Sequence, residues 1–369
     1  MDRSKWEYKK LGEVCNLYQP KTISSDMLIP DGKYLVYGAN GVIGKYNEYN
    51  HENSEVLMTC RGATCGTINV SAPYSWINGN AMVVHPRIND LSAQFLVYQL
   101  KAADKTSVIT GAAQPQITRQ MLQTLPFVVA PLADQQRIVA ELDCLNEMIA
   151  VKQEQLKEFD KLAQSIFYDM FGRGTSQQQW DQTTIGDIAE EIKYGTSSPA
   201  TPNGKYKYLR MNNMTNDGYL DLSDLKYIDV DESNYEKYVV RKGDVLFNRT
   251  NSRELVGKTA LFDFEEEMII AGYIIRVRLK ALANPCFVVR YMNLPEQKDY
   301  LRGLCRGAIG QANINAKELQ AIPIPLPPLS LQQEFAEKIS AIEAQKELVK
   351  QSIAETQHLL DYTMDKYFG

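Results

Sequence analysis

The chain has 369 residues, 44% of them hydrophobic, so it is long enough for two or three domains that each bury a core. Its formal net charge is −5, and no apolar run approaches the roughly 20 residues of a membrane-spanning helix. The first ten residues, MDRSKWEYKK, lack the apolar segment of a secretory signal. These features exclude a membrane-spanning protein and predict a soluble protein of the cytoplasm.

The six cysteines are scattered along the chain without the spacing of a disulfide framework. We interpret them as free thiols in a reducing compartment. Cys60 and Cys65 are close in sequence, but no paired histidine motif lies near them, which disfavours a zinc site. No metal site is therefore predicted.

Residues 1–130 are predicted to form a mixed α/β domain rich in loops. Residues 33–46 (KYLVYGANGVIGKY) form a β-rich run that contains three glycines. The glycine spacing is not that of a dinucleotide-binding loop, and two alternatives stay open: a turn between strands, or a loop that lets the backbone approach a ligand. A strand at 55–59, a Gly/Thr-rich loop with Arg61 at 60–67, a strand region at 76–84 and a helix at 92–102 follow.

Residues 131–172 carry apolar residues at steps of three and four, which predicts a long helix with a coiled-coil seam. The seam positions chosen for pairing with another helix are Ile138, Leu142, Leu145, Ile149, Leu156, Phe159 and Ile166. The alternative is that each long helix packs on its own globular domain.

Residues 173–327 are predicted to form a second α/β domain on the same plan as the first. Its opening, WDQTTIGDI from Trp180, resembles WEYKKLGEV from Trp6. The predicted elements are strands at 208–212, 244–248 and 269–279 and a short helix at 287–293. The loop RTNSRELVGK, residues 249–258, takes the place of the Arg61 loop.

Residues 328–369 repeat residues 131–172 at a constant separation of 197 residues, which indicates a duplicated unit of domain plus helix. Gln135-Gln136 returns as Gln332-Gln333, and Phe171-Gly172 as Phe368-Gly369. The pairing positions chosen in this second helix are Phe335, Ile339, Ile342, Val349, Ile353 and Leu360. Lys152 interrupts the first seam and Lys346 the second, and each repeat has an apolar residue where the other has the lysine.

Sequence motifs for catalysis are missing. Gly257-Lys258-Thr259 resembles the end of a P-loop, but Ser252 stands where the first glycine belongs. The carboxylate and acid-x-Lys spacing of a restriction nuclease is absent, as is the Asn/Asp-Pro-Pro-aromatic loop of an amino-methyltransferase. The three histidines are too far apart in sequence for acid–base catalysis. The chain is therefore predicted to be non-catalytic.

Taken together, the motifs resemble the specificity subunit of type I restriction–modification systems. Both halves open with Trp-x5-Gly-[Glu/Asp], continue with Gly…Gln-x-x-Ile and a proline segment, and end with Pro-Leu-x-x-Gln-Gln and a long helix. The resemblance implies target-recognition domains at 1–130 and 173–327, each reading half of a bipartite site in double-stranded DNA. It implies an antiparallel coiled coil formed by the spacer helices, 131–172 and 328–369.

The resemblance also implies partners. These are two methylation subunits and two restriction or translocase subunits, which bring S-adenosylmethionine, ATP and Mg²⁺, so no cofactor is expected in this chain. The acidic excess of the sequence lies in the two helix segments, while the domains are neutral to slightly basic, which permits DNA binding. A 38-residue helix is about 57 Å long, so we interpret the helices as a spacer between half-sites.

The candidate DNA-binding residues lie in loops, first of all in loops that differ between the two units. Arginine suits guanine, asparagine suits adenine and lysine more often contacts phosphate. Each side chain is as readily explained as a solvated loop residue or a turn cap. Gln114 and Gln311 occur in both repeats, which favours architecture or phosphate contact. The full set is Tyr37, Asn40, Lys45, Arg61, Thr64, Asn80, Gln114, Arg210, Asn212, Asn213, Arg249, Asn251, Arg253, Lys258 and Gln311.

The alternative function is a coiled-coil scaffold whose two α/β heads bind proteins and read no DNA. The acidic net charge favours this alternative. Binding that depends on DNA sequence distinguishes the two.

Overall fold

A computed structural model describes residues 3–111, 114–173, 179–305 and 312–369. The chain divides into two compact units. The first unit comprises Met1–Gln153 and Lys350–Gly369, and the second comprises Glu154–Val349. Each unit therefore contains one globular head and a segment of both long helices. Among the described residues, no helix has the length and apolar character needed to cross a membrane.

The head of the first unit is built from short strands in small sheets. One sheet has the order β2-β8-β5-β6, another has the order β4-β3-β7, and β1 pairs with β9. Strand β3 is antiparallel to β4 and parallel to β7. The elements are η1 (Arg3–Lys5), β1 (Glu7–Lys10), α1 (Leu11–Val14), β2 (Cys15–Tyr18), η2 (Ser25–Met27), β3 (Tyr34–Gly38), β4 (Gly41–Tyr46), β5 (Val56–Thr59), β6 (Ile68–Val70), β7 (Trp76–Ile77), β8 (Ala81–Pro86), α2 (Ala93–Ala102), α3 (Arg119–Leu122) and β9 (Pro126–Val129).

The head of the second unit repeats this topology. Its sheets have the orders β11-β19-β15-β17 and β13-β12-β18-β14, with pairs β10-β21 and β16-β20. The elements are β10 (Asp181–Thr184), α5 (Ile185–Ile188), β11 (Ala189–Tyr194), β12 (Tyr206–Leu209), η4 (Met211–Asn213), β13 (Lys226–Ile228), α6 (Glu232–Tyr238), β14 (Val239–Val240), β15 (Val245–Asn248), β16 (Thr250–Asn251), β17 (Thr259–Leu261), β18 (Met268–Ile270), β19 (Ile274–Leu279), α7 (Pro285–Met292), α8 (Pro295–Leu304), β20 (Ala312–Asn313), α9 (Ala316–Gln320) and β21 (Pro323–Leu326).

The duplication seen in the sequence is also present in the strand pairing. Strand β12 is antiparallel to β13 and parallel to β18, as β3 is to β4 and β7 in the first unit. The second head adds α6 and β14 between these shared strands. The predicted strand at 269–279 was wrong, because a turn at Ala271–Tyr273 divides it into β18 and β19, which belong to different sheets.

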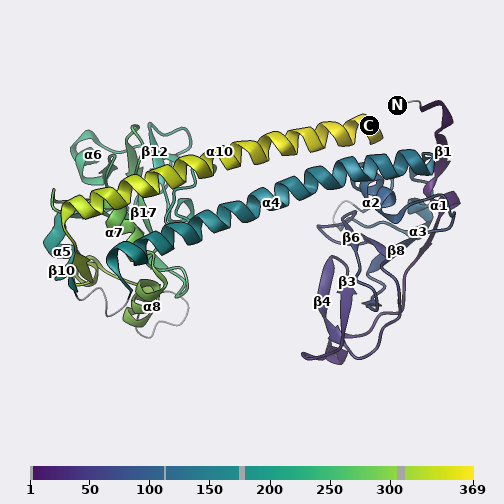
Figure 1. The fold of residues 1–369 in the computed structure, drawn as a ribbon, viewed down its shortest axis with the longest axis horizontal. Helices are drawn as coiled ribbons and strands as arrows, with labels where there is room; N and C mark the ends of the chain where they lie inside the picture. The colour runs from purple at the N-terminus through teal and green to yellow at the C-terminus, as the bar shows by residue number, and fades with distance from the viewer. Residues whose placement is uncertain (1–2, 112–113, 174–178, 306–311) are drawn as a thin grey trace. The chain divides into compact units, whose positions relative to one another are not determined.

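The two long helices are α4 (Leu132–Phe171) and α10 (Leu329–Phe368), with 40 residues each, and they lie side by side in Figure 1. In the first unit the Tyr367 hydroxyl donates to Glu141 at 2.6 Å, and Lys152 donates to the Thr356 hydroxyl at 2.8 Å. Residue numbers thus rise along one helix as they fall along the other. The predicted antiparallel pair and the mixed α/β architecture are confirmed.

In the second unit Lys346 is the polar centre of the helix pair. Its side chain is 6% exposed, and its ammonium donates to Asp160 of α4 at 2.6 Å and to the Tyr219 hydroxyl at 2.8 Å. Burial alone would lower the pKa of Lys346, but these two bonds outweigh it and the pKa is raised. The ammonium therefore stays charged and ties α10 to both α4 and the head.

The seam positions chosen in the sequence lie in the cores that the helices share with the heads. Ile138, Leu142, Leu145, Ile149 and Leu360 are buried in the first unit's core, where Ile353 packs partly buried. Phe335, Ile339 and Ile342 are buried in the second unit's core, where Phe159 and Ile166 pack partly buried. Leu156 and Val349 are partly exposed. Helix pairing and head packing thus use the same residues, and the two alternatives weighed for the seam both occur.

Two buried glutamines, Gln135 and Gln332, join each head to the start of its own helix. Gln135 donates to the Ala130 carbonyl at 2.8 Å and accepts from the Ser92 backbone N–H at 2.9 Å. Gln332 donates to the Pro327 carbonyl at 2.8 Å and accepts from the Asn284 N–H at 2.8 Å. Ser92 and Asn284 are the N-caps of α2 and α7, so the repeated Gln-Gln motif includes a structural joint.

Each long helix ends on an aromatic contact with the other head. Phe171 at the end of α4 meets Phe287 of α7, with ring centroids 4.8 Å apart. Phe368 at the end of α10 meets Phe95 of α2, with centroids 5.4 Å apart. The repeated Phe-Gly motif therefore places one aromatic anchor in each unit.

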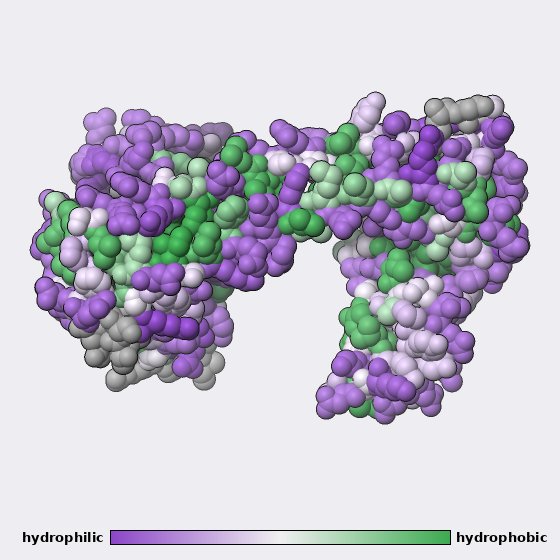
Figure 2. Space-filling view, viewed as in Figure 1, coloured by the Kyte–Doolittle hydropathy of each residue, from purple (hydrophilic) through white to green (hydrophobic). Residues whose placement is uncertain are grey.

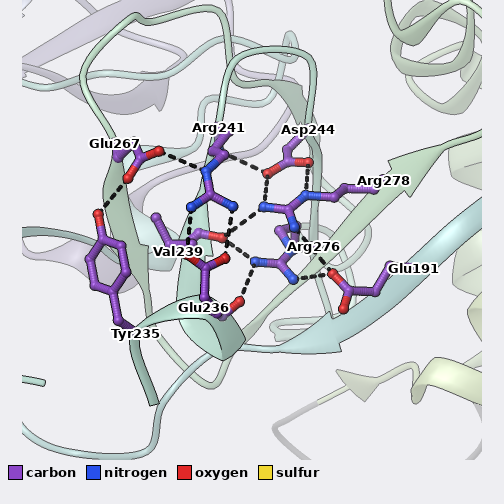
Figure 3. A network of polar contacts seen from close by, with 9 residues as sticks. All are labelled: Glu191, Tyr235, Glu236, Val239, Arg241, Asp244, Glu267, Arg276 and Arg278. Atoms are coloured by element: carbon purple, nitrogen blue, oxygen red, sulfur yellow. Dashed lines mark hydrogen bonds and ion pairs between the residues drawn. The ribbon is translucent and has the colours of Figure 1, made fainter. Parts of the chain in front are cut away.

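A polar network ties the two larger sheets of the second head together (Figure 3). Arg276 of β19 is fully buried and donates to the Val239 carbonyl of β14 and to Glu191 of β11. Arg278, also in β19, donates to Asp244 at 3.0 Å. A fully buried guanidinium requires such partners, because an unpaired charge in the interior is costly.

Candidate nucleic-acid interface

A recess of about 470 Å³ opens on the second head, and we call it the Arg249 recess. It lies where the loop after β11, the end of β12, the end of β15 and the turn between β18 and β19 meet. Its lining residues are Thr196, Ser197, Ser198, Pro199, Ala200, Tyr208, Arg210, Met211, Asn212, Arg249, Ala271, Gly272 and Tyr273.

Close backbone packing forms the floor of the recess. The Thr196 N–H donates to the Ile270 carbonyl at 2.9 Å, and the Gly272 N–H donates to the Thr196 carbonyl at 2.7 Å. A Cβ on Gly195 would collide with the carbonyl oxygens of residues 270 and 271, so only glycine allows this approach. The loop 196–200 is thereby held against the turn 271–273.

Among the described residues, Arg249 is held in place without a carboxylate partner. Its guanidinium carbon lies 5.0 Å from the centre of the Tyr194 ring, and one terminal nitrogen donates to the Gly272 carbonyl at 3.4 Å. Its Nε is buried without a hydrogen-bond partner in the part of the chain that the structure describes. Its backbone N–H donates to the Tyr273 carbonyl at 2.9 Å. The contacts of the Arg249 guanidinium within the described part of the chain are thus an aromatic ring and a carbonyl.

Arg210 lines the same recess but is already paired. One terminal nitrogen donates to the Asp224 carboxylate at 2.9 Å and to the Asp224 carbonyl at 3.0 Å. This guanidinium lowers the pKa of Asp224, with Lys226 adding to the effect. The pair neutralises much of the charge that Arg210 would otherwise contribute to the recess.

The other candidate DNA-binding residues in the second head differ in their exposure and in their hydrogen-bond partners. The Asn213 side chain is 2% exposed and donates to the Asp221 and Asp224 carbonyls. Asn251 donates to the Asn248 side chain at 3.1 Å. Arg253 and Asn212 are exposed. Gln311 lies outside the described residues.

Lys258 lies beside Lys298, a lysine that sequence analysis did not select. Lys258 donates to the Met214 carbonyl at 2.9 Å, and Lys298 donates to the Gly257 carbonyl at 3.2 Å. Burial lowers the pKa of both, and for Lys298 burial together with the Lys258 charge lowers the pKa to about 8. The two ammonium groups bond to carbonyls, and neither forms an ion pair with a carboxylate among the described residues.

In the first head most candidates lie on the surface. Tyr37 is the exception, at 8% exposure, and its hydroxyl accepts from the Ala72 N–H at 2.9 Å. The Asn40 side-chain oxygen Oδ1 accepts from the Asn69 side-chain amide at 3.2 Å. The exposed candidates are Asn40, Lys45, Arg61, Thr64, Asn80 and Gln114.

Both heads bring the arginine-bearing loop against the later polar loop. In the first head the Ile117 N–H donates to the Cys60 carbonyl at 2.9 Å, and Arg61 forms a β-bridge with Gln116. In the second head the Ile314 N–H donates to the Arg249 carbonyl at 2.8 Å. Segments about 55 to 65 residues apart in sequence thus form one loop cluster per head.

An aromatic group on the first head was also missed from sequence. Tyr49 packs edge-on against Tyr34 and Tyr74, with ring centroids 5.1 and 5.3 Å apart. Tyr74 is 53% exposed and has a φ of 50°, which is rare for an aromatic residue. Val42 and Ile43 of β4 are about half exposed, and Figure 2 shows apolar residues gathered over the β3–β4 region.

The lining residues of the Arg249 recess that sequence analysis did not select are Tyr208, Met211, loop 196–200 and turn 271–273. Tyr194, which contacts Arg249 beside the recess, was not selected either. The Lys193–Ser198 segment, KYGTSS, has the composition of a loop that follows a strand. That signal places a loop there. It does not place the loop beside Arg249, because the contact depends on the order of strands in the sheets.

Comparison with known protein families gives the same match twice. The profile of the type I restriction modification DNA specificity domain matches residues 3–160 and again residues 177–358. The specificity subunit of the EcoKI restriction enzyme of Escherichia coli K12 is 21% identical over 333 residues, which cover 86% of this chain and 68% of the relative. The putative MjaX specificity subunit of Methanocaldococcus jannaschii is 27% identical over 172 residues, covering 45% of this chain and 40% of the relative.

Solved structures of specificity subunits share the fold. The type I restriction–modification S subunit of M. genitalium superposes with a TM-score of 0.56 at 13% identity, covering 100% of this chain and 98% of that one. A chain from a study of complex assembly in the type I system gives a TM-score of 0.57 at 18% identity, covering 99% and 98%. At these identities the likeness concerns the fold alone.

Proposed function

Because the chain belongs to the family of type I restriction modification DNA specificity domains, we propose that it is the DNA specificity subunit of a type I restriction–modification complex. Each head reads one half of a bipartite site in double-stranded DNA. The observation that carries the proposal is the double match to the specificity domain, on two heads with the same strand topology and different loops.

The proposed division of the chain follows from the duplicated unit. Residues 1–130 and 173–327 are the target-recognition domains, and residues 131–172 and 328–369 are the spacer helices. The helices are matched at 40 residues, and a continuous helix of that length measures about 60 Å. We propose that they set the number of base pairs between the half-sites.

The chain is proposed to act without catalysing a reaction itself, in the cytoplasm, as part of a larger complex. Two methylation subunits and two restriction or translocase subunits supply the chemistry and bind S-adenosylmethionine, ATP and Mg²⁺. The DNA-contacting set keeps the loop residues named above, with Arg249, Arg253, Asn212 and Arg61 first, since arginine and asparagine suit base edges and none of these side chains forms an ion pair among the described residues.

Methylome sequencing tests the proposed function. We expect a host strain that carries the gene and its cognate methylation subunit to show adenine methylation at one bipartite motif, and deletion of the gene to remove it. Purified chain with its methylation subunit should then shift duplexes that contain the motif. A scaffold would give neither the motif nor binding that depends on sequence, and that result would reject the proposal.

Exposed apolar residues at matching positions suggest where the two methylation subunits dock. Val151 and Leu348 occupy equivalent positions of the repeats and are 62% and 57% exposed. Leu162 and Leu359 are equivalent as well, at 46% and 51%. In each helix the two residues are 11 positions apart, about three turns, and share a face. Figure 2 shows apolar residues between hydrophilic ones along the helices.

Replacing Val151 by glutamate is therefore expected to remove one methylation subunit, and Val151→Glu with Leu348→Glu to remove both, because a charge on an apolar contact opposes burial. Native mass spectrometry of the complex measures the stoichiometry. Gln153→Glu, an exposed change on the opposite face of the same helix, is the matched control and should keep two subunits. Unchanged stoichiometry in the double variant would place docking elsewhere.

A further inference from the structure

The Arg249 recess has the chemistry of a site for one base of double-stranded DNA, and we propose that it receives the major-groove edge of a guanine. The proposal rests on the proposed function and deepens it: the half-site read by the second head contains a guanine contacted by Arg249. Guanine offers two adjacent acceptors, N7 and O6, which match the paired donors of a guanidinium.

The fixed orientation of Arg249 favours base reading. The Tyr194 ring, whose centre lies 5.0 Å from the guanidinium carbon, and the bond to the Gly272 carbonyl both restrain the guanidinium. A planar fork of donors whose plane is already set loses little side-chain entropy when it meets two acceptors in that plane. Such a geometry discriminates between bases, whereas a freely rotating ammonium contributes mainly charge.

The lining of the recess argues against a phosphate as the occupant. Of its two arginines, Arg210 is paired with Asp224, so Arg249 alone presents an uncompensated charge among the lining residues. Pro199, Ala200 and Ala271 add apolar surface, and Ser197 and Ser198 add hydroxyl groups. Apolar contacts and neutral hydrogen-bonding groups suit a base edge, whereas backbone contacts on DNA are mainly supplied by several cations.

Lys258 and Lys298 provide the contrast within the same head. Both are ammonium groups bonded to backbone carbonyls, and neither lines the Arg249 recess. They have the character of phosphate contacts, which would bind DNA of any sequence. Sequence reading and backbone contact are thus assigned to different residues of this head.

The test uses the chain with its cognate methylation subunits and duplexes that carry the methylated motif. Each guanine in the half-site read by the second head is replaced in turn by 7-deazaguanine, which lacks the N7 acceptor. For the unmodified chain we expect one such duplex to bind about threefold to tenfold more weakly, because one of the two bonds of a bidentate pair is lost. For Arg249→Ala the same replacement should cause no further loss, because the partner of N7 is already gone.

Two further variants separate reading from folding and from charge. Arg249→Lys keeps the charge and loses the fork, so it should bind DNA but accept other bases at that position. Arg302→Ala removes an exposed arginine that is paired with Asp299, and it should leave the recognised motif unchanged. Thermal unfolding of each complex reports whether a variant has a fold defect. If Arg249→Ala has one, the test of the inference rests on the 7-deazaguanine series with the unmodified chain and on Arg249→Lys.

Two outcomes would overturn the inference alone, and a third would reject the proposed function as well. Loss of affinity by Arg249→Ala that is equal for all sequences, with a smaller salt dependence, would make Arg249 a phosphate contact. If no 7-deazaguanine replacement weakened binding, guanine would not be the occupant of the recess. In both cases sequence-dependent binding by the unmodified chain would leave the proposed function intact, whereas its absence would reject both.

Discussion

Replacing Arg276 by alanine should lower the free energy of unfolding of the second unit by about 3 kcal/mol, the lower end of the range for breaking a buried ion pair. Arg276 is fully buried and bonds to the Val239 carbonyl and Glu191 across two sheets. Its removal leaves that carbonyl with one donor fewer, together with a cavity. The Glu191 side chain is 33% exposed, so water compensates part of its charge, which places the effect at the lower end.

Denaturant unfolding with hydrogen exchange measured by mass spectrometry checks this prediction, because exchange assigns the loss to a unit. We expect faster exchange in β11, β14 and β19 and unchanged exchange in the first head. Arg241→Ala is the matched control: this arginine bonds to Glu236 and Glu267 but is 37% exposed, and its loss should change the unfolding free energy by about 1 kcal/mol or less. Similar losses of unfolding free energy in both variants would mean that burial of the arginine does not determine the size of the effect.

Exchange of residues 1–130 for the corresponding domain of another specificity subunit should change one half of the methylated motif and leave the other half and the spacer unaltered. The second head and both helices remain, so their contribution to the motif remains. The exchanged domain needs an aromatic residue in place of Phe95, which receives Phe368, and a backbone that fits Gln135.

Methylome sequencing of the chimera reads out both half-sites at once. Exchange of residues 173–327 is the reciprocal control and should change the opposite half. A chimera that alters both halves, or the spacer alone, would contradict independent reading by the two heads.

The long helices could be predicted from the sequence, because steps of three and four in apolar residues require a helix and a repeat separated by 197 residues requires two. The residues that bond to the two lysines that interrupt the apolar seams could not be predicted. Lys152 meets Thr356, and Lys346 meets Asp160 and Tyr219. These contacts follow from the antiparallel register and from one head loop, neither of which a comparison of the two repeats contains.

The Arg249 recess was only partly predictable. Arg249 was selected because it lies in a polar loop that differs between the repeats, but Tyr194 and the turn at Gly272 are far from it in sequence. The apolar stretch 269–279 is typical of one long strand, and only the assignment of β18 and β19 to different sheets produces the turn. Sheet assignment is a tertiary property, so local pattern is a poor guide to it.

Gln135 and Gln332 bind the heads through backbone groups only: carbonyl oxygens and the N–H of a helix cap. Every residue presents a carbonyl, and every residue except proline presents an N–H, whatever its side chain. Neither joint therefore requires any particular side chain from the head it holds. The amino-acid sequence of a head's loops can therefore change while its attachment to the helix stays the same. This is a physical route by which one scaffold acquires new specificities.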